Sequence, residues 1–112
     1  MLHEPRQRRS WLILDVRQKM KSVRLTIENK RETAMLVFVE PEAFDYWLAV
    51  GEACELVAEQ EKEGAYFEIH QTDDGITVFP SRGCGFITAM RAGVALECGH
   101  QRPATWAHRE NA

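Results

Sequence analysis

The sequence predicts an α+β domain, with an antiparallel sheet of about five strands packed on one face by one or two helices. Two observations support this prediction. Residues 11–39 contain short alternating or fully apolar runs that are typical of strands, and residues 41–62 carry apolar side chains at helical spacing. The expected order of elements is β-β-β-α-β-β-α. With 112 residues, of which 45% are hydrophobic, the chain has the size and composition of one globular domain.

The first part of the chain is expected to form three strands in an antiparallel meander. Residues 11–16 and 22–29 alternate apolar and polar side chains, and the polar residues between these runs suit a hairpin connection. Residues 33–39 are apolar on both faces, which is typical of a strand covered from both sides or by a partner chain. We therefore also expect a homodimer, since one helix cannot cover a sheet of this width.

The main helix is expected over residues 41–62. Pro41 suits a first helical turn, and Asp45 favours the positive N-terminal end of a helix. One side of this helix would carry five apolar residues: Trp47, Val50, Cys54, Val57 and Ala58. Leu48 and Leu56 lie off this stripe, and we expect them to be exposed on the surface; the alternative is that the helix contacts something besides its own sheet.

The second part of the chain predicts a hairpin followed by an ambiguous segment. Residues 65–70 and 76–79 alternate, and the sequence Thr-Asp-Asp-Gly between them predicts a turn in which Gly75 has a positive φ. Residues 83–98 favour a helix because Phe86, Met90 and Val94 recur at helical spacing. The alternative is a pair of strands that turns through Arg-Ala-Gly at residues 91–93.

The domain boundaries follow from composition. We expect a flexible basic arm at residues 1–10, one domain at 11–99, and a surface or frayed tail at 100–112. Asp15 and Arg17 interrupt the apolar run after the basic start, which argues against a secretory signal. Three cysteines cannot all pair within one chain, so a cytoplasmic location with reduced thiols is expected. No apolar run has the length of a membrane span, so no membrane partner is predicted.

Candidate metal ligands occur near the end of the chain. Cys84, Cys98, His100 and His108 would supply the four ligands of a tetrahedral zinc site. Their spacing lacks the short ligand pairs that hold structural zinc, and two buried thiols with two exposed histidines explain them as well. We therefore predict no metal and no cofactor.

A catalytic site has little support in the sequence. Cys84 would be activated if it began a helix beside Arg82, but a cysteine phosphatase needs an arginine where this chain has Met90. The pair Asp73 and Asp74 fits the expected turn better than a cation site or acid–base chemistry. The sequence therefore predicts a binding protein and no enzymatic activity.

Charge is distributed unevenly along the chain. Residues 1–31 carry nine Lys or Arg against three Asp or Glu, and residues 32–80 carry twelve acids against Lys62 alone. Such asymmetry can steer a protein toward an anionic partner through one face and a cationic partner through another.

The preferred prediction is binding of single-stranded nucleic acid through the first hairpin. Trp11 would stack on a base, while three cations on the same sheet face would neutralise phosphates: Arg17, Lys19 and Arg24. The flexible arm would add Arg6, Arg8 and Arg9. The order of three strands, then Pro-Glu-Ala-Phe and an amphipathic helix, is similar to sheet-plus-helix modules that bind single-stranded nucleic acid. This resemblance concerns the order of elements over about half of the chain.

The alternative is an acidic module that binds or inhibits a basic protein. Residues 40–63 contain eight acids, and we expect four of them on one helix flank: Glu52, Glu55, Glu59 and Glu63. Both predictions require that the cations gather on an open sheet face while these carboxylates lie on a separate helix.

Overall fold

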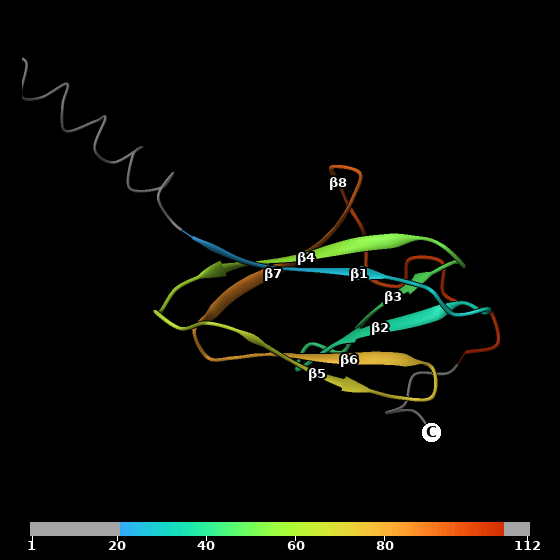
Figure 1. The fold of residues 1–112 in the computed structure, drawn as a ribbon, viewed down its shortest axis with the longest axis horizontal. Helices are drawn as coiled ribbons and strands as arrows, with labels where there is room; N and C mark the ends of the chain where they lie inside the picture. Colours follow the sequence, from blue (N-terminus) through green and yellow to red (C-terminus); the bar gives the residue numbers. More distant parts are fainter. Residues whose placement is uncertain (1–20, 107–112) are drawn as a thin grey trace, which may run out of the picture.

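The computed structural model describes residues 21–106, which form two facing sheets of four strands each (Figure 1). Sheet A has the strand order β1-β4-β7-β8, and sheet B has the order β3-β2-β6-β5. The described residues contain no helix. The predicted α+β class is therefore wrong, and the architecture is a β-sandwich.

The eight strands divide equally between the sheets. Sheet A contains β1 (Ser22–Glu28), β4 (Ala53–Gln60), β7 (Cys84–Arg91) and β8 (Val94–Ala95). Sheet B contains β2 (Met35–Val39), β3 (Phe44–Leu48), β5 (Phe67–Gln71) and β6 (Gly75–Pro80). β2 and β6 are parallel, and the other paired strands are antiparallel.

The segment predicted as the main helix, residues 41–62, forms β3 and β4. Leu48 and Leu56, which the helical interpretation placed on the surface, are fully buried. In β4, buried Cys54 and Leu56 alternate with residues on the outer face, so the strand period explains positions that the helical period left out. Gly51, with a φ of +84°, turns the chain between the two strands.

The second predicted helix, residues 83–98, is replaced by β7 and β8. The strand alternative is correct: Met90 pairs with Ala95, and the chain turns through Ala92 and Gly93. Both turn residues have positive φ, 51° and 80°, as a two-residue hairpin turn of type I′ requires. The two positive φ values are incompatible with the continuous helix predicted over residues 83–98. With both helices absent, the resemblance to sheet-plus-helix modules does not hold.

The second and third predicted strands of the chain are confirmed, but their pairing is not. Residues 22–29 and 33–39 contain β1 and β2, which lie in different sheets. β1 pairs with β4, while β2 lies between β3 and β6. The predicted meander is therefore wrong, and its first strand, residues 11–16, lies outside the described residues.

The predicted β5–β6 hairpin is confirmed. The Thr72 amide donates a hydrogen bond to the Gly75 carbonyl at 2.8 Å, which closes the turn. Gly75 has a φ of 158°, close to extended, so positive φ is not its main role. A Cβ at Gly75 would lie 2.7 Å from the Leu36 nitrogen and collide with the Leu36 carbonyl oxygen. The absence of a side chain therefore allows β6 to approach β2.

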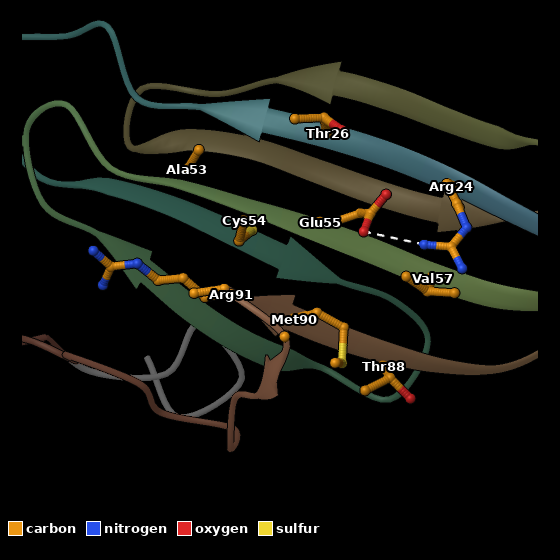
Figure 2. Close-up of a pocket in the computed structure, with 11 residues that line it drawn as sticks. Arg24, Thr26, Ala53, Cys54, Glu55, Val57, Thr88, Met90 and Arg91 are labelled. Carbon is orange, nitrogen blue, oxygen red and sulfur yellow. Dashed lines mark hydrogen bonds and ion pairs between the residues drawn. The ribbon is translucent and has the colours of Figure 1, made fainter.

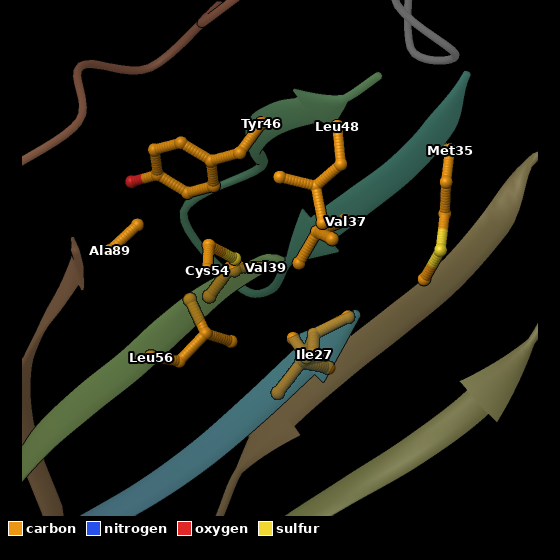
Figure 3. Packing of buried hydrophobic residues seen from close by; sticks show 10 residues of the cluster. Ile27, Met35, Val37, Val39, Tyr46, Leu48, Cys54, Leu56 and Ala89 are labelled. Atoms are coloured by element: carbon orange, nitrogen blue, oxygen red, sulfur yellow. The ribbon is translucent and has the colours of Figure 1, made fainter. Parts of the chain in front are cut away.

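One hydrophobic core fills the space between the sheets (Figure 3). Sheet A contributes Leu56 and Ala89, and sheet B contributes Val37 and Val78. A smaller cluster lies on the outer face of sheet B and consists of Leu36, Phe38 and Trp47 with partly buried Ala43 and Trp106. β2 is therefore covered on both faces within one chain, so its apolar character does not by itself require a partner.

Residues 97–106, here called the C-terminal strap, pack against β3. The Gly99 amide donates to the Asp45 carbonyl, and the Trp47 amide donates to the His100 carbonyl at 2.9 Å. The Arg102 guanidinium contacts both carboxylate oxygens of Asp45, at 2.8 and 2.6 Å. The rings of Trp47 and Trp106 meet edge to face, with centroids 5.5 Å apart. The strap therefore covers the β3 edge of sheet B.

Candidate functional site

Most of the predicted nucleic-acid site cannot be placed. Trp11, Arg17, Lys19, Arg6, Arg8 and Arg9 all lie outside the described residues. Arg24 projects from the outer face of sheet A, where its Nη1 lies 3.2 Å from Glu55 Oε1. Its Nε donates to the Ser22 hydroxyl at 3.1 Å. The expected separation of cations from carboxylates is therefore absent at Arg24.

The predicted acidic flank is also arranged differently, because its helix does not exist. Glu55 and Glu59 lie on the outer face of β4, Glu52 precedes this strand, and Glu63 follows it. Glu55 has Arg24 as its partner. Glu63 accepts a hydrogen bond from Gln60 at 3.3 Å and is exposed.

Glu52 connects three parts of the fold. It accepts hydrogen bonds from the Gln101 amide at 2.8 Å and the Ala49 backbone at 2.7 Å, and it pairs with Arg91 at 2.8 Å. The Gln101 and Ala49 hydrogen bonds and the Arg91 charge together lower the pKa of Glu52, although burial opposes them. The Glu52 carboxylate therefore stabilises the fold through its contacts with Gln101, Ala49 and Arg91.

Two of the candidate metal ligands, the thiols of Cys84 and Cys98, contact different oxygens of the protein. Cys84 Sγ contacts the Tyr66 carbonyl at 3.5 Å, and Cys98 Sγ contacts Asp45 Oδ1 at 3.4 Å. His108 lies outside the described residues. No group of three or more His, Cys, Asp or Glu side chains within residues 21–106 is arranged to hold a metal ion.

The thiol hypothesis loses its physical basis at Cys84. This residue begins strand β7, so no helix dipole stabilises a thiolate there. Cys54 is buried in the core, and burial raises the pKa of its thiol to about 11, although the Arg91 charge opposes the shift. Cys54 is therefore protonated at neutral pH and packs as a small apolar side chain.

The outer face of sheet A forms an open groove of about 620 Å³ across β1, β4 and β7 (Figure 2). We call this the sheet A groove. Its lining residues are Arg24, Thr26, Ala53, Cys54, Glu55, Val57, Thr88, Met90, Arg91, Ala92 and Gly93. The β7–β8 hairpin projects from the sheet and forms a wall at one end of the groove (Figure 1).

The sheet A groove combines an apolar floor with neutralised charges. Val57 and Met90 contribute apolar side chains from adjacent strands. Arg24 pairs with Glu55 inside the groove, and Arg91 pairs with Glu52 at its end. A ligand would therefore meet apolar surface bordered by ion pairs, with no unbalanced charge among these four residues.

Further apolar surface continues along β7. Phe86 is 74% exposed, and strand alternation places it on the same face as Thr88 and Met90. Val94, in the hairpin wall, is 64% exposed. Exposed apolar side chains beside an apolar groove are typical of an interaction surface.

Sequence reasoning missed this groove because it assigned Val57 and Met90 to buried helix faces. The signal that would have found it is alternation. Leu56 and Ala89 are buried, so their neighbours Val57 and Met90 must face the other side of sheet A.

The described residues hold no helix of a length and apolar character that would cross a membrane. Comparisons of the chain with protein-family models, with curated proteins and with solved structures gave no match.

Proposed function

We propose that this protein is a non-enzymatic interaction module that binds an extended, mainly apolar peptide segment of another protein in the sheet A groove. The observation that carries the proposal is the apolar floor formed by Val57 and Met90 between charged pairs. A solvent-facing side of a sheet is ordinarily polar, so apolar residues there need another explanation.

Charge favours a peptide over nucleic acid. Arg24 and Arg91, the two cations that line the groove, both contact glutamates. Residues 21–106 carry fourteen Asp or Glu against eight Lys or Arg. A phosphate backbone would compete with Glu52 and Glu55 for these arginines and be repelled by the surrounding carboxylates.

Shape favours an extended segment. The groove lies on the open face of sheet A over β1, β4 and β7, and Ala92 and Gly93 of the β7–β8 turn are part of its lining. Side chains of an extended peptide alternate, so every second one can contact the apolar floor while the others remain in water.

The test uses peptides selected from a random phage-displayed library on the full chain, with affinity measured by fluorescence anisotropy. Met90→Glu places an unpaired carboxylate on the apolar floor, and we expect it to weaken binding by about tenfold or more. The matched control is Tyr66→Glu, because Tyr66 is 58% exposed and lies outside the groove lining. This control should retain its affinity.

A fluorescent single-stranded oligonucleotide provides the second arm. We expect no binding that depends on Arg24. Salt-dependent binding that Arg24→Ala weakens, together with peptides insensitive to Met90→Glu, would overturn the proposal in favour of the nucleic-acid alternative.

A further inference from the structure

β1 forms an edge of sheet A and has β4 as its one strand partner among residues 21–106. The Asn29 amide donates to Glu52, and the Lys21 carbonyl accepts from Gln60, so odd-numbered residues face β4. In an antiparallel ladder the even-numbered residues then direct their amides and carbonyls toward the open edge. Four residues of β1 share this orientation: Ser22, Arg24, Thr26 and Glu28.

This edge lacks the features that prevent strand pairing. β1 is seven residues long and contains no proline, and its paired register with β4 is continuous. Its inward-facing residues are apolar: Val23, Leu25 and Ile27. Proteins commonly block such edges with proline, bulges or inward-facing charges. The two edge strands of sheet B differ from β1. The strap covers the edge at β3, and the other edge strand, β5, is shorter than β1, with five residues.

We propose that two copies of this chain pair antiparallel through their β1 strands, with the two-fold axis at Thr26. In this register Arg24 of one copy lies opposite the partner's Glu28, and this pair occurs twice. Leu25 lies opposite the partner's Ile27, so the apolar inner face continues across the interface. A register centred on Leu25 would place Arg24 opposite Thr26 and lose both charge pairs.

The side chains involved are available for this pairing. Arg24 is 57% exposed, and its guanidinium has donors beyond the one that contacts Glu55. The Glu28 side chain is 51% exposed, and its contact with Lys30 is long, at 3.8 Å. A two-fold axis perpendicular to the sheet keeps both outer faces on one side, so the two sheet A grooves would share a continuous surface.

A symmetric disulfide tests the geometry. In the full chain with Cys84→Ser and Cys98→Ser, Thr26→Cys would place two thiols opposite each other at the axis. Directly paired residues have Cα atoms about 5.5 Å apart, within the range that a disulfide bridges. Thr88→Cys in the same background is the control, because the two copies of β7 would lie about 24 Å apart. After copper-phenanthroline oxidation, non-reducing gels should show dimer for Thr26→Cys alone.

Charge reversal tests the register independently of folding. R24E or E28R would place like charges opposite each other, and we expect each to raise the dimer dissociation constant by about tenfold in sedimentation velocity. The double variant R24E/E28R restores opposite charges and should recover dimerisation. It does not restore the Arg24 contact with Glu55, so recovery would identify the intermolecular pair.

The inference would be overturned if the wild type sedimented as a monomer at its highest soluble concentration and Thr26→Cys gave no cross-linked dimer. The β1 edge would then be unpaired or covered by another segment, such as residues 11–16. Cross-linking without rescue in R24E/E28R would overturn the proposed register. The inference goes beyond the proposed function. Glu28 lies outside the groove lining, so peptide affinity measured on E28R reports on the groove separately from dimerisation.

Discussion

Asp45 is a carboxylate with no solvent exposure, and it is surrounded by donors. Arg102 contacts both of its oxygens, and the Trp47 indole donates to Oδ2 at 3.0 Å. Burial raises the pKa of Asp45, but the hydrogen bonds from Arg102, Trp47 and Cys98 and the Arg102 charge outweigh it, so the pKa falls below the usual value. Asp45 therefore holds the C-terminal strap in its ionised form.

Asp45→Asn should lower the free energy of unfolding by about 1–3 kcal/mol at neutral pH, because it removes the charged acceptor of Arg102. The folded-state pKa lies below the ordinary value of 3.8. The stabilising contribution of Asp45 is thus present above that value and is lost as pH falls through the folded-state pKa. Urea denaturation between about pH 5 and pH 2 should show a smaller loss of stability for the variant than for the wild type. Equal losses would contradict this role.

At the scale of elements, alternation in the sequence was sufficient to predict β1 and the β5–β6 hairpin, and a continuous apolar run was sufficient to predict β2. Alternation was not sufficient to predict β3 and β4, because the apolar residues of 41–62 also recur at the spacing of an amphipathic helix. Two features favoured strands there: Leu48 and Leu56 lay off the stripe, and Gly51 interrupted the segment. Partner choice could not be predicted, since a strand's local pattern carries no information about which distant strand it joins.

The candidate site shows the same limit. Arg24 was correctly expected on an open sheet face. Its contact with Glu55 follows from the β1–β4 register, in which Arg24 lies opposite Val57 and Glu55 is the diagonal neighbour two residues away on the same face. That register depends on long-range pairing, so the sequence alone could not indicate that the predicted anion-binding cation has a carboxylate partner.

Gly75→Ala tests the close approach of β2 and β6. The new Cβ would collide with the Leu36 backbone, which cannot move without disrupting the parallel pair, so we expect a loss of at least about 2 kcal/mol. Gly51→Asn is the control. Nothing lies within 4 Å of a Cβ at Gly51, and asparagine tolerates its positive φ, so the loss should be below about 1 kcal/mol. Similar losses in urea denaturation would contradict the close approach.

At the scale of the whole molecule, both sheets share one core, so they should unfold together. Leu56→Ala, in sheet A, should lower stability by about 2–5 kcal/mol. Val57→Ala, on the opposite face of the same strand, should cost less than about 1 kcal/mol. Tryptophan fluorescence, to which Trp47 of sheet B contributes, and far-ultraviolet circular dichroism should give one coincident transition for each variant. Separate transitions would show that the sheets are independent.

The parallel pairing of β2 with β6 has a consequence for folding kinetics. Leu36 must find Gly75, and the intervening chain includes β4, which belongs to the opposite sheet. Closing the loop between these two residues costs conformational entropy before the contact between β2 and β6 stabilises the chain. Proteins with many such contacts between distant residues have high contact order and fold in milliseconds to seconds. On the ribosome, the β2–β3 hairpin emerges early, but neither layer can close until residues 75–91 have been synthesised. Folding of this domain therefore follows the synthesis of β6 and β7.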